Sequence, residues 1–225
     1  MANLEREYKF GLPNNWTHFT LTNYDMVRGH IVNIQMFDMV SDDYDTEGGI
    51  LTNGGHSFRR RVENDKPVFT LKVLRDDNGQ GKRERTEYEV DDDCSLDEAV
   101  TQIYQKCIAA GDKKGQQLIA YAASPIVDAT HIFASKLRKF RTRAFTRYEY
   151  LIDFCDVTLA IAVDAGIKIL REGELDEETT RIRKIDLEYK DGNVETFEKY
   201  VQAFEFCTGL RRITEASVTD LNYDL

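Results

Sequence analysis

The sequence contains no long apolar run and no closely spaced pair of metal-binding cysteines. A membrane-spanning helix needs about 20 predominantly apolar residues, and no stretch approaches that length. The opening residues Met-Ala-Asn-Leu-Glu lack the basic and then apolar order of a signal peptide. We therefore expect a cytoplasmic protein without a membrane partner.

Cysteine and histidine are both sparse, with four residues of each. The cysteines form no CxxC pair and have no histidine at ligand spacing, so they indicate neither a zinc site nor a disulfide framework. The histidines also lack the spacing of metal ligands. These eight residues are Cys94, Cys107, Cys155, Cys207, His18, His30, His56 and His131.

Charge is abundant, at 31% of the 225 residues, beside 41% hydrophobic residues. This composition is typical of a soluble globular protein with a real core. No break in composition divides the chain, so we expect one domain over residues 1–225. The formal net charge of -10 argues against a nucleic-acid partner, because an acidic protein repels phosphate unless its basic residues are gathered in one place.

The N-terminal residues alternate between charged and apolar side chains. Read as a strand, Glu5, Glu7 and Lys9 share one face. Leu4, Tyr8 and Phe10 lie on the other face, together with Arg6. The same period predicts further strands over residues 30–40, 56–63, 68–74, 83–90, 130–150, 153–164 and 181–190. Because short turns join most of the first five, we expect those five to form an antiparallel meander.

Three helical segments complete the expected architecture. Ser95 and Glu98 have the spacing of a capping box, and apolar residues then repeat at helical spacing up to Gly111. A short helix over 116–123 would complete a helical insertion at about 94–128, and a final helix occupies about 194–211. The segment 16–28 is expected to be a short helix or an ordered loop.

About eight strands that are apolar on one face can be arranged in two ways. In a flat open sheet, the charged faces would simply be solvated. In a closed barrel, the apolar faces point outward beneath helices and the charges line an interior. We expect the second arrangement: a β-dominated α+β fold with an eight-stranded antiparallel closed barrel and helices packed outside it.

The charged faces supply both signs to such an interior. Dense Arg and Lys residues repel one another unless acidic neighbours or a polyanion offset them. Phosphate oxygens suit Arg and Lys, and carboxylates suit Mg2+ or Mn2+. The expected cations are Lys9, Arg59, Arg61, Lys72, Arg85, Lys139, Arg141, Arg143 and Lys190; the acids are Glu5, Glu7, Glu87, Glu89, Asp186 and Glu188, with Asp164 a further candidate. Outward salt bridges remain an alternative for Arg60, Arg143 and Glu63.

The N-terminal Glu5-x-Glu7-x-Lys9 resembles the ExExK signature of the CYTH or triphosphate tunnel metalloenzyme superfamily. Further matches follow in the family's order along nearly the whole chain: Tyr44-Asp45-Thr46, Ser57 to Arg61, Thr70-Leu71-Lys72, Arg85-x-Glu87-x-Glu89, Lys139-x-Arg141 and Asp186 to Lys190. An ExExK motif alone would be a weak indication of the family, whereas the ordered set of motifs is fairly specific for it.

The resemblance implies an eight-stranded tunnel that binds triphosphates with a divalent metal, Mg2+ or Mn2+. Glu5, Glu7, Asp186 and Glu188 would face the metal. Lys9, Arg59, Arg61, Lys72, Lys139 and Arg141 would bind phosphate, with Arg85 and Lys190 as further candidates from the charged faces. Glu87 and Glu89 would serve the metal and its water, or hold the arginines; with Glu5, Glu7 and Lys9 they form the expected catalytic set.

The sequence departs from the family's pattern in two places. Asp186 stands where the family more often has Glu, and the helical insertion could be a lid or a dimer contact, so a homodimer is possible. We expect metal-dependent hydrolysis of inorganic triphosphate or another small triphosphate. The alternatives are adenylate cyclase, thiamine triphosphatase with Trp16 near the thiamine, a module that binds polyphosphate or a nucleotide without turnover, and a carrier barrel, which a charged lining contradicts.

Overall fold

The computed structural model describes residues 3–13, 15–77, 82–91, 94–120, 129–171 and 184–213, and within these it describes the side chains of residues 4–165 and 184–213. Within these residues, no helix has the length and apolar content needed to cross a membrane.

Eight strands and seven helices make up the described chain. The strands are β1 (Asn3–Gly11), β2 (Ile31–Thr46), β3 (Ser57–Glu63), β4 (Lys66–Asp77), β5 (Lys82–Asp91), β6 (Leu137–Phe154), β7 (Val157–Arg171) and β8 (Lys184–Gly192). The helices are the 3-10 helix η1 (His18–Asn23), α1 (Asp25–Arg28), α2 (Ile50–Asn53), α3 (Leu96–Ala109), α4 (Lys113–Ala120), α5 (Ala129–Lys136) and α6 (Val194–Thr208).

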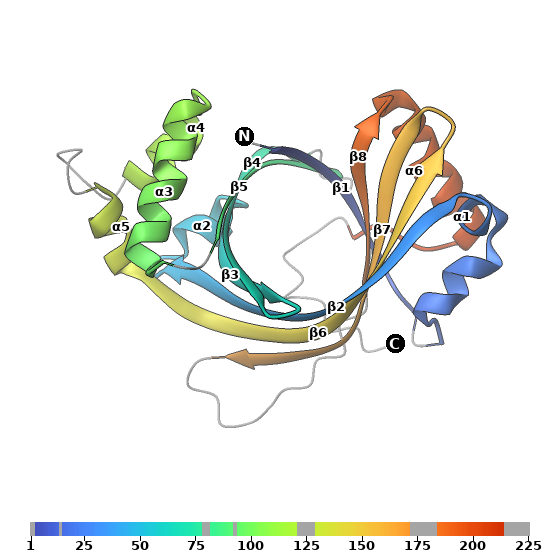
Figure 1. Cartoon of the computed structure of the whole chain (residues 1–225), viewed down its shortest axis with the longest axis horizontal. Helices are drawn as coiled ribbons and strands as arrows, with labels where there is room; N and C mark the ends of the chain where they lie inside the picture. The colour runs from blue at the N-terminus through green and yellow to red at the C-terminus, as the bar shows by residue number, and fades with distance from the viewer. Residues whose placement is uncertain are drawn as a thin grey trace.

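The strands close into an antiparallel barrel in the order β1-β5-β4-β3-β2-β6-β7-β8. Figure 1 shows the ring of strands, with α3, α4 and α5 outside one side and α1 and α6 outside the other. The expected eight-stranded closed barrel with external helices is therefore confirmed. The expected meander is correct for β2 to β5, but β1 pairs with β5 and β8 and so closes the ring instead of pairing with β2.

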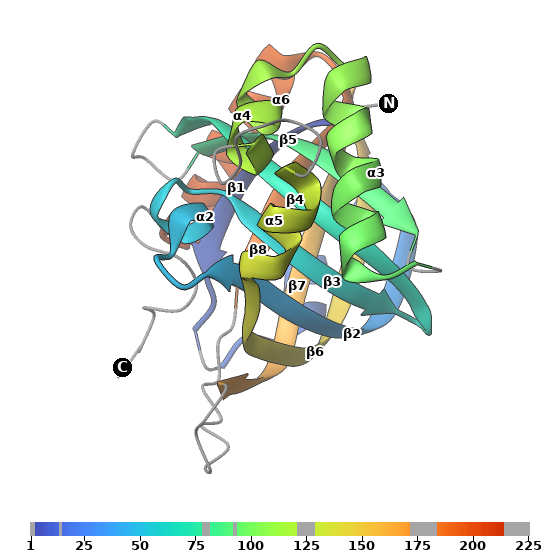
Figure 2. The same ribbon diagram turned by 90° about the vertical axis from the view of Figure 1, so that its left-hand side faces the viewer.

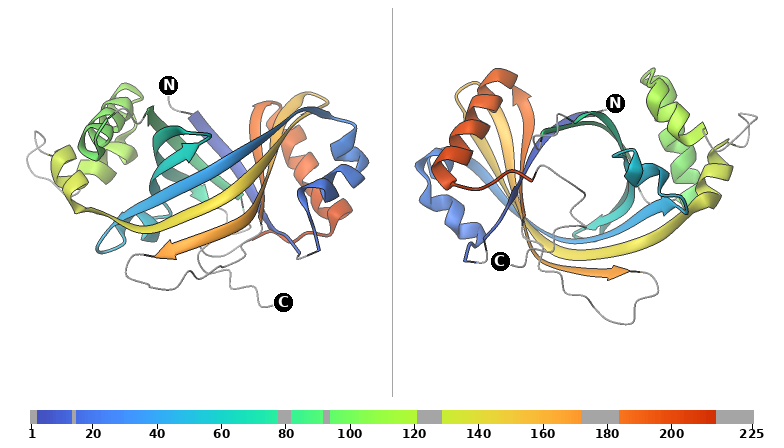
Figure 3. Two further views of the ribbon diagram at one scale, coloured as in Figure 1. Left: turned by 60° about the horizontal axis from the view of Figure 1, so that its bottom comes forward. Right: turned by 180° about the vertical axis from the view of Figure 1, so that it is seen from behind.

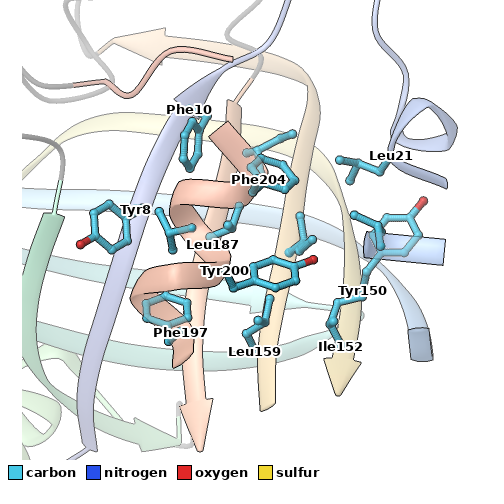
Figure 4. Packing of buried hydrophobic residues seen from close by; sticks show 14 of the residues in the cluster. Tyr8, Phe10, Leu21, Tyr150, Ile152, Leu159, Leu187, Phe197, Tyr200 and Phe204 are labelled. Atoms are coloured by element: carbon cyan, nitrogen blue, oxygen red, sulfur yellow. The ribbon is translucent and has the colours of Figure 1, made fainter. Parts of the chain in front are cut away.

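One outer side of the barrel is covered by α6. Apolar side chains of β1, β7 and β8 pack there, and the Phe10 and Phe204 rings meet edge to face with 5.4 Å between centroids. Figure 4 shows this layer, in which Leu187 of β8 lies among the aromatic side chains of α6. The apolar stripe of the final helix thus packs on the sheet, as its periodicity predicts.

The helical insertion covers another outer side. Phe58, Leu71 and Tyr88 of β3, β4 and β5 pack against Ile103 of α3 and Phe133 of α5. Figure 2 shows α3, α4 and α5 lying across these strands. The expected capping box opens α3: Ser95 Oγ accepts from the Glu98 amide at 3.3 Å, and the Glu98 carboxylate accepts from the Ser95 amide at 2.8 Å. The described part of the expected insertion, residues 94–120, therefore packs against the outside of the barrel, and residues 121–128 lie outside the described residues.

Several expected boundaries are wrong, and three of them change how the barrel is built. Residues 130–136 form most of α5 instead of a strand, because Phe133 and Ala134 bury against the α3 cluster and this packing overrides their strand-like composition. Strand β2 continues through Asp42 to Thr46, where the sequence indicated its end. β7 begins at Val157, after a turn in which Cys155 has φ of 54°. Figure 3 shows the long strands β2 and β6 curving side by side.

Candidate functional site

The barrel encloses a cavity of about 460 Å³ whose walls are mostly charged. This volume lies within the usual range for small-molecule sites, about 300–1,000 Å³. The expected residues among its lining are Glu5, Glu7, Lys9, Arg59, Arg61, Lys72, Arg85, Glu87, Glu89, Arg141, Arg143, Asp186, Glu188 and Lys190. The structure therefore brings these residues, which the alternation of the sequence placed on the charged faces of strands, together around one cavity.

Lys139 is the exception among the expected cations, and the further candidate Asp164 is buried but is also absent from the lining. The pairing of β2 with β6 shifts by one residue between Asp43/Arg141 and Tyr44/Lys139, so Phe140 is an extra residue in β6. Such a bulge interrupts the alternation of the strand, so that residues on its two sides, such as Lys139 and Arg141, lie on opposite faces. Lys139 is half exposed, and its ammonium lies 3.8 Å from Asp42 instead of lining the cavity with Arg141. The expectation that Lys139 shares the lining is therefore wrong.

Three carboxylates come together where β1 meets β8. Glu7 lies directly opposite Glu188 in the strand register, an arrangement of like charges that is unfavourable by itself. One carboxylate oxygen from each of Glu5, Glu7 and Glu188 lies within 4.8 Å of the others. This group contains three of the four expected metal-facing acids.

The electrostatics of this acid cluster differ from one member to the next. Burial raises the pKa of Glu5; Lys72 opposes this effect, but the nearby carboxylates of Glu7 and Glu188 add to it, so the pKa stays above its usual value. Burial also opposes ionisation of Glu7, yet Lys9 and Arg85 outweigh it and hold its pKa well below the usual range. Glu5 is 9% exposed, and its Oε2 atom has no hydrogen-bond partner among the described residues.

Asp186 is not part of this acid cluster. It lies opposite Lys9 in the β1–β8 register, and Lys9 Nζ is 3.3 Å from its Oδ1. Its Oδ2 contacts Lys184 Nζ and, at 3.3 Å, Arg147 Nη2. Among the described residues, the fourth expected metal-facing acid is thus surrounded by three cations.

Basic residues occupy the neighbouring part of the wall. Arg59 has a single ion pair among the described residues, with Glu87 at 3.9 Å, and its buried Nε has no hydrogen-bond partner there. Burial and the like charge of Arg61 lower the pKa of Arg59 to about 10. The guanidinium of Arg59 is therefore a buried cation whose charge its neighbours offset only weakly.

Lys72 connects the basic wall to the acid cluster. Its ammonium lies 2.6 Å from Glu5 Oε1 and 3.3 Å from Glu87 Oε1. Glu89, at the exposed rim, lies 3.3 Å from Arg61 Nη2. The family resemblance implies that Glu87 and Glu89 either serve the metal and its water or hold basic side chains in place. The contacts with Lys72 and Arg61 favour the second role.

Several lining residues were not selected from the sequence as part of the site. Asp43 is buried and lies 2.7 Å from Arg141 Nε and 2.8 Å from Arg143 Nη2. Arg147 and Lys184 also line the cavity. Arg147 lies on the same face of β6 as Arg141 and Arg143, so the alternation of that strand was a signal that could have identified it.

The matched segment Tyr44-Asp45-Thr46 has a local structural role. The Asp45 carboxylate accepts hydrogen bonds from the Leu51 and Thr52 amides, each at 2.9 Å, and from Thr52 Oγ1 at 2.6 Å. These bonds satisfy free amides of the short helix α2. Asp45 thus fixes α2 to the end of β2.

No family model and no curated protein matches the sequence. Solved structures do match over almost the whole chain. HpAC1 from Hippeastrum, described as a candidate adenylyl cyclase with a dominant triphosphatase activity, is 14% identical with a TM-score of 0.53, covering 95% of this chain and 91% of its own. Candidate adenylate cyclases from Bacillus halodurans and Vibrio parahaemolyticus are each 13% identical with TM-scores of 0.51, covering 98% of both chains.

Identities this low establish a shared fold and no more. In this chain the fold is an eight-stranded antiparallel barrel with charged side chains lining its cavity. It agrees with the eight-stranded barrel that the resemblance of the sequence implied.

Proposed function

We propose that this protein hydrolyses inorganic triphosphate, or another small molecule that carries a triphosphate, inside the barrel with the help of a divalent cation. One observation carries the proposal: a single cavity contains a weakly neutralised cationic wall at Arg59 and a crowded anionic cluster at Glu5, Glu7 and Glu188. In a triphosphate with a bound divalent cation, the phosphates would contact the basic wall at Arg59 and the cation would contact the acid cluster.

The acid cluster fits Mg2+ or Mn2+. Both ions prefer oxygen ligands, and the unpartnered buried Glu5 Oε2 supplies one beside the carboxylates of Glu7 and Glu188. Glu188 keeps its charge because Lys190 and Arg147 outweigh its burial and lower its pKa to about 2. A divalent cation held there would neutralise phosphate charge and lower the pKa of an attacking water.

The protein's own cations do the remaining work. Arg59 of β3 and Arg143 of β6 lie on the two strands that flank β2 and would bind non-bridging phosphate oxygens, while Lys72 and Lys9 add positive charge near the acid cluster. Because these groups are fixed before substrate arrives, they stabilise charge that develops at the leaving phosphate without reorganising. No covalent intermediate with the protein is required.

A nucleoside triphosphate is the second candidate substrate. Phe140, the extra residue of the β6 bulge, lies on the cavity lining and is 36% exposed. The Arg141 guanidinium lies 5.2 Å from the centre of its ring. A partly exposed aromatic ring with an arginine over it is a place where a base can stack.

The test is release of phosphate from inorganic triphosphate, ATP and thiamine triphosphate, each with Mg2+, Mn2+ or EDTA. We expect metal-dependent release that Glu5→Gln reduces by about 100-fold or more, the scale on which preorganised electrostatic groups act. Glu84→Gln is the matched control, because Glu84 pairs with Arg6 at 2.7 Å and does not line the cavity.

The other outcomes identify other functions. Formation of cyclic AMP from ATP would assign a cyclase. Tight binding of triphosphate with no release from any substrate would assign a binding module and exclude the hydrolase.

A further inference from the structure

Lys184 contacts two buried acids of neighbouring strands. Its ammonium lies 3.0 Å from Asp164 Oδ2 on β7 and also contacts Asp186 Oδ2 on β8. The side chain is 7% exposed, and those of Asp164 and Asp186 are 1% and 2% exposed. Two acids so close together in a buried place repel each other strongly unless a cation lies between them. Lys184 is that cation.

Arg147 of β6 contacts the same two acids, Asp164 and Asp186. It makes two hydrogen bonds to Asp164, at 2.7 and 3.0 Å, and lies 3.3 Å from Asp186 Oδ2. It reaches Asp186 across β7, where Ala162 lies between the two strands in register with Asp186. An alanine there leaves room for the long guanidinium side chain.

We propose that Lys184 occupies the position between Asp164 and Asp186 that a second divalent cation would otherwise take. The barrel then holds one divalent cation, at Glu5, Glu7 and Glu188. Asp186 is a positioning residue that holds Lys9 and Arg147. This inference rests on the proposed function and deepens it, because it gives the number of metal ions and separates Asp186 from the other three expected metal-facing acids.

Charge and geometry favour the Lys184 ammonium over a second divalent cation beside Asp186. Asp186 already contacts Lys9 Nζ, Arg147 Nη2 and Lys184 Nζ, so a metal ion there would have to approach three positive groups. Glu5 presents the opposite case, since its Oε2 is buried and unpartnered among the described residues.

The test counts Mn2+ ions bound to the full chain, with Mn2+ alone as the probe and the signal of free Mn2+ as the measurement. We expect one site in the wild type, loss of that site in Glu188→Gln, and one site in Asp186→Asn. Lys184→Met keeps most of the side-chain length but removes the cation, so we expect it to bind two Mn2+ ions and to gain more thermal stability from added Mn2+ than the wild type does.

Two wild-type sites, or loss of the single site in Asp186→Asn, would overturn the inference. Asp186→Asn keeps the test decisive if Lys184→Met does not fold. Failure here is distinguishable from failure of the proposed function: two sites with intact triphosphate hydrolysis would refute only the role of Lys184. Absence of any Mn2+ site would overturn the inference and the metal dependence together.

Discussion

Arg147 and Asp164 form a bidentate ion pair, with Arg147 Nε 2.7 Å from Asp164 Oδ1 and Arg147 Nη2 3.0 Å from Asp164 Oδ2. The two residues lie opposite each other in the register of β6 and β7. Burial opposes the charge on both, but their mutual attraction outweighs it, so the pKa of Asp164 is lowered and that of Arg147 is raised. Asp164 thus holds the guanidinium of Arg147, a residue that lines the cavity.

Replacing one partner of this pair should destabilise the fold. We expect Asp164→Asn to reduce the free energy of unfolding by about 3–5 kcal/mol, because it leaves a buried arginine with less compensation. Denaturant unfolding measures the change. The matched control is Asp25→Asn, since Asp25 and Arg28 form an exposed pair, for which about 0–1 kcal/mol is expected. Equal effects in the two variants would contradict the role of the buried pair.

Arg59 should contribute to ligand binding more than to stability. We expect Arg59→Gln to weaken binding of inorganic triphosphate in EDTA by about 10- to 100-fold, the equivalent of one charged hydrogen bond of about 1.5–3 kcal/mol. Its unfolding free energy should not fall, because the variant removes a buried charge that Glu87 offsets only from 3.9 Å. Titration calorimetry and denaturant unfolding give the two values.

Arg60→Gln is the control for that experiment. Arg60 is the next residue of β3 and does not line the cavity. Binding should therefore change by less than about 2-fold, as for most surface substitutions. Equal losses in both variants would show that triphosphate binds outside the barrel.

The bulge in β6 predicts a contrast between two basic residues that the sequence treats alike. Lys139→Gln should leave the KM for triphosphate within about 2-fold of the wild type, because Lys139 points to Asp42 on the outside. Arg141→Gln should raise the KM, because Arg141 lines the cavity. Steady-state kinetics of the two variants decides, and a larger effect at Lys139 would refute the observed register.

His56 gives stability a pH dependence of known sign. Its Nδ1 accepts a hydrogen bond from the Leu74 amide at 2.9 Å. Burial and then the charge of Lys114 lower its pKa from 6.5 to about 4. The folded protein therefore favours the neutral ring, and the unfolded chain takes up the proton first as the pH falls. The stability that this group contributes is complete above pH 6.5 and is lost as the pH falls toward about 4.

Replacing His56 should flatten that part of the stability curve. Urea unfolding of His56→Asn and wild type between pH 7 and pH 4 measures the difference, and Asn retains an acceptor for the Leu74 amide. His131→Asn is the control, because the side chain of His131 is 74% exposed. An unchanged slope in His56→Asn would contradict the lowered pKa.

Much of the site could be predicted because strand alternation is a local property. Glu5, Glu7 and Lys9 share a face whatever strand lies beside them. Repetition of this pattern indicated a closed barrel, and the structure confirms it. The apolar stripes on the outer faces likewise predicted the covering helices α3 and α6.

The remainder depended on relations between distant strands. A one-residue shift in the β2–β6 register moved Lys139 out of the cavity, and residue spacing within one strand does not encode such a shift. Asp43 lies beyond residue 40, where the sequence indicated the end of the strand, yet it pairs with Arg141 and Arg143 across the sheet. The separation of Asp186 from the acid cluster likewise arises in part from Lys9 of β1 and Arg147 of β6, which reach it only in the folded barrel.

One cavity should bind both a triphosphate and a divalent cation. The decisive measurement is the anomalous scattering of Mn2+ in crystals grown with Mn2+ and inorganic triphosphate. We expect a manganese peak bound by Glu5, Glu7 and Glu188, with the phosphate chain extending from it to Arg59. Manganese and phosphate density outside the barrel, with the cavity holding only water, would contradict it.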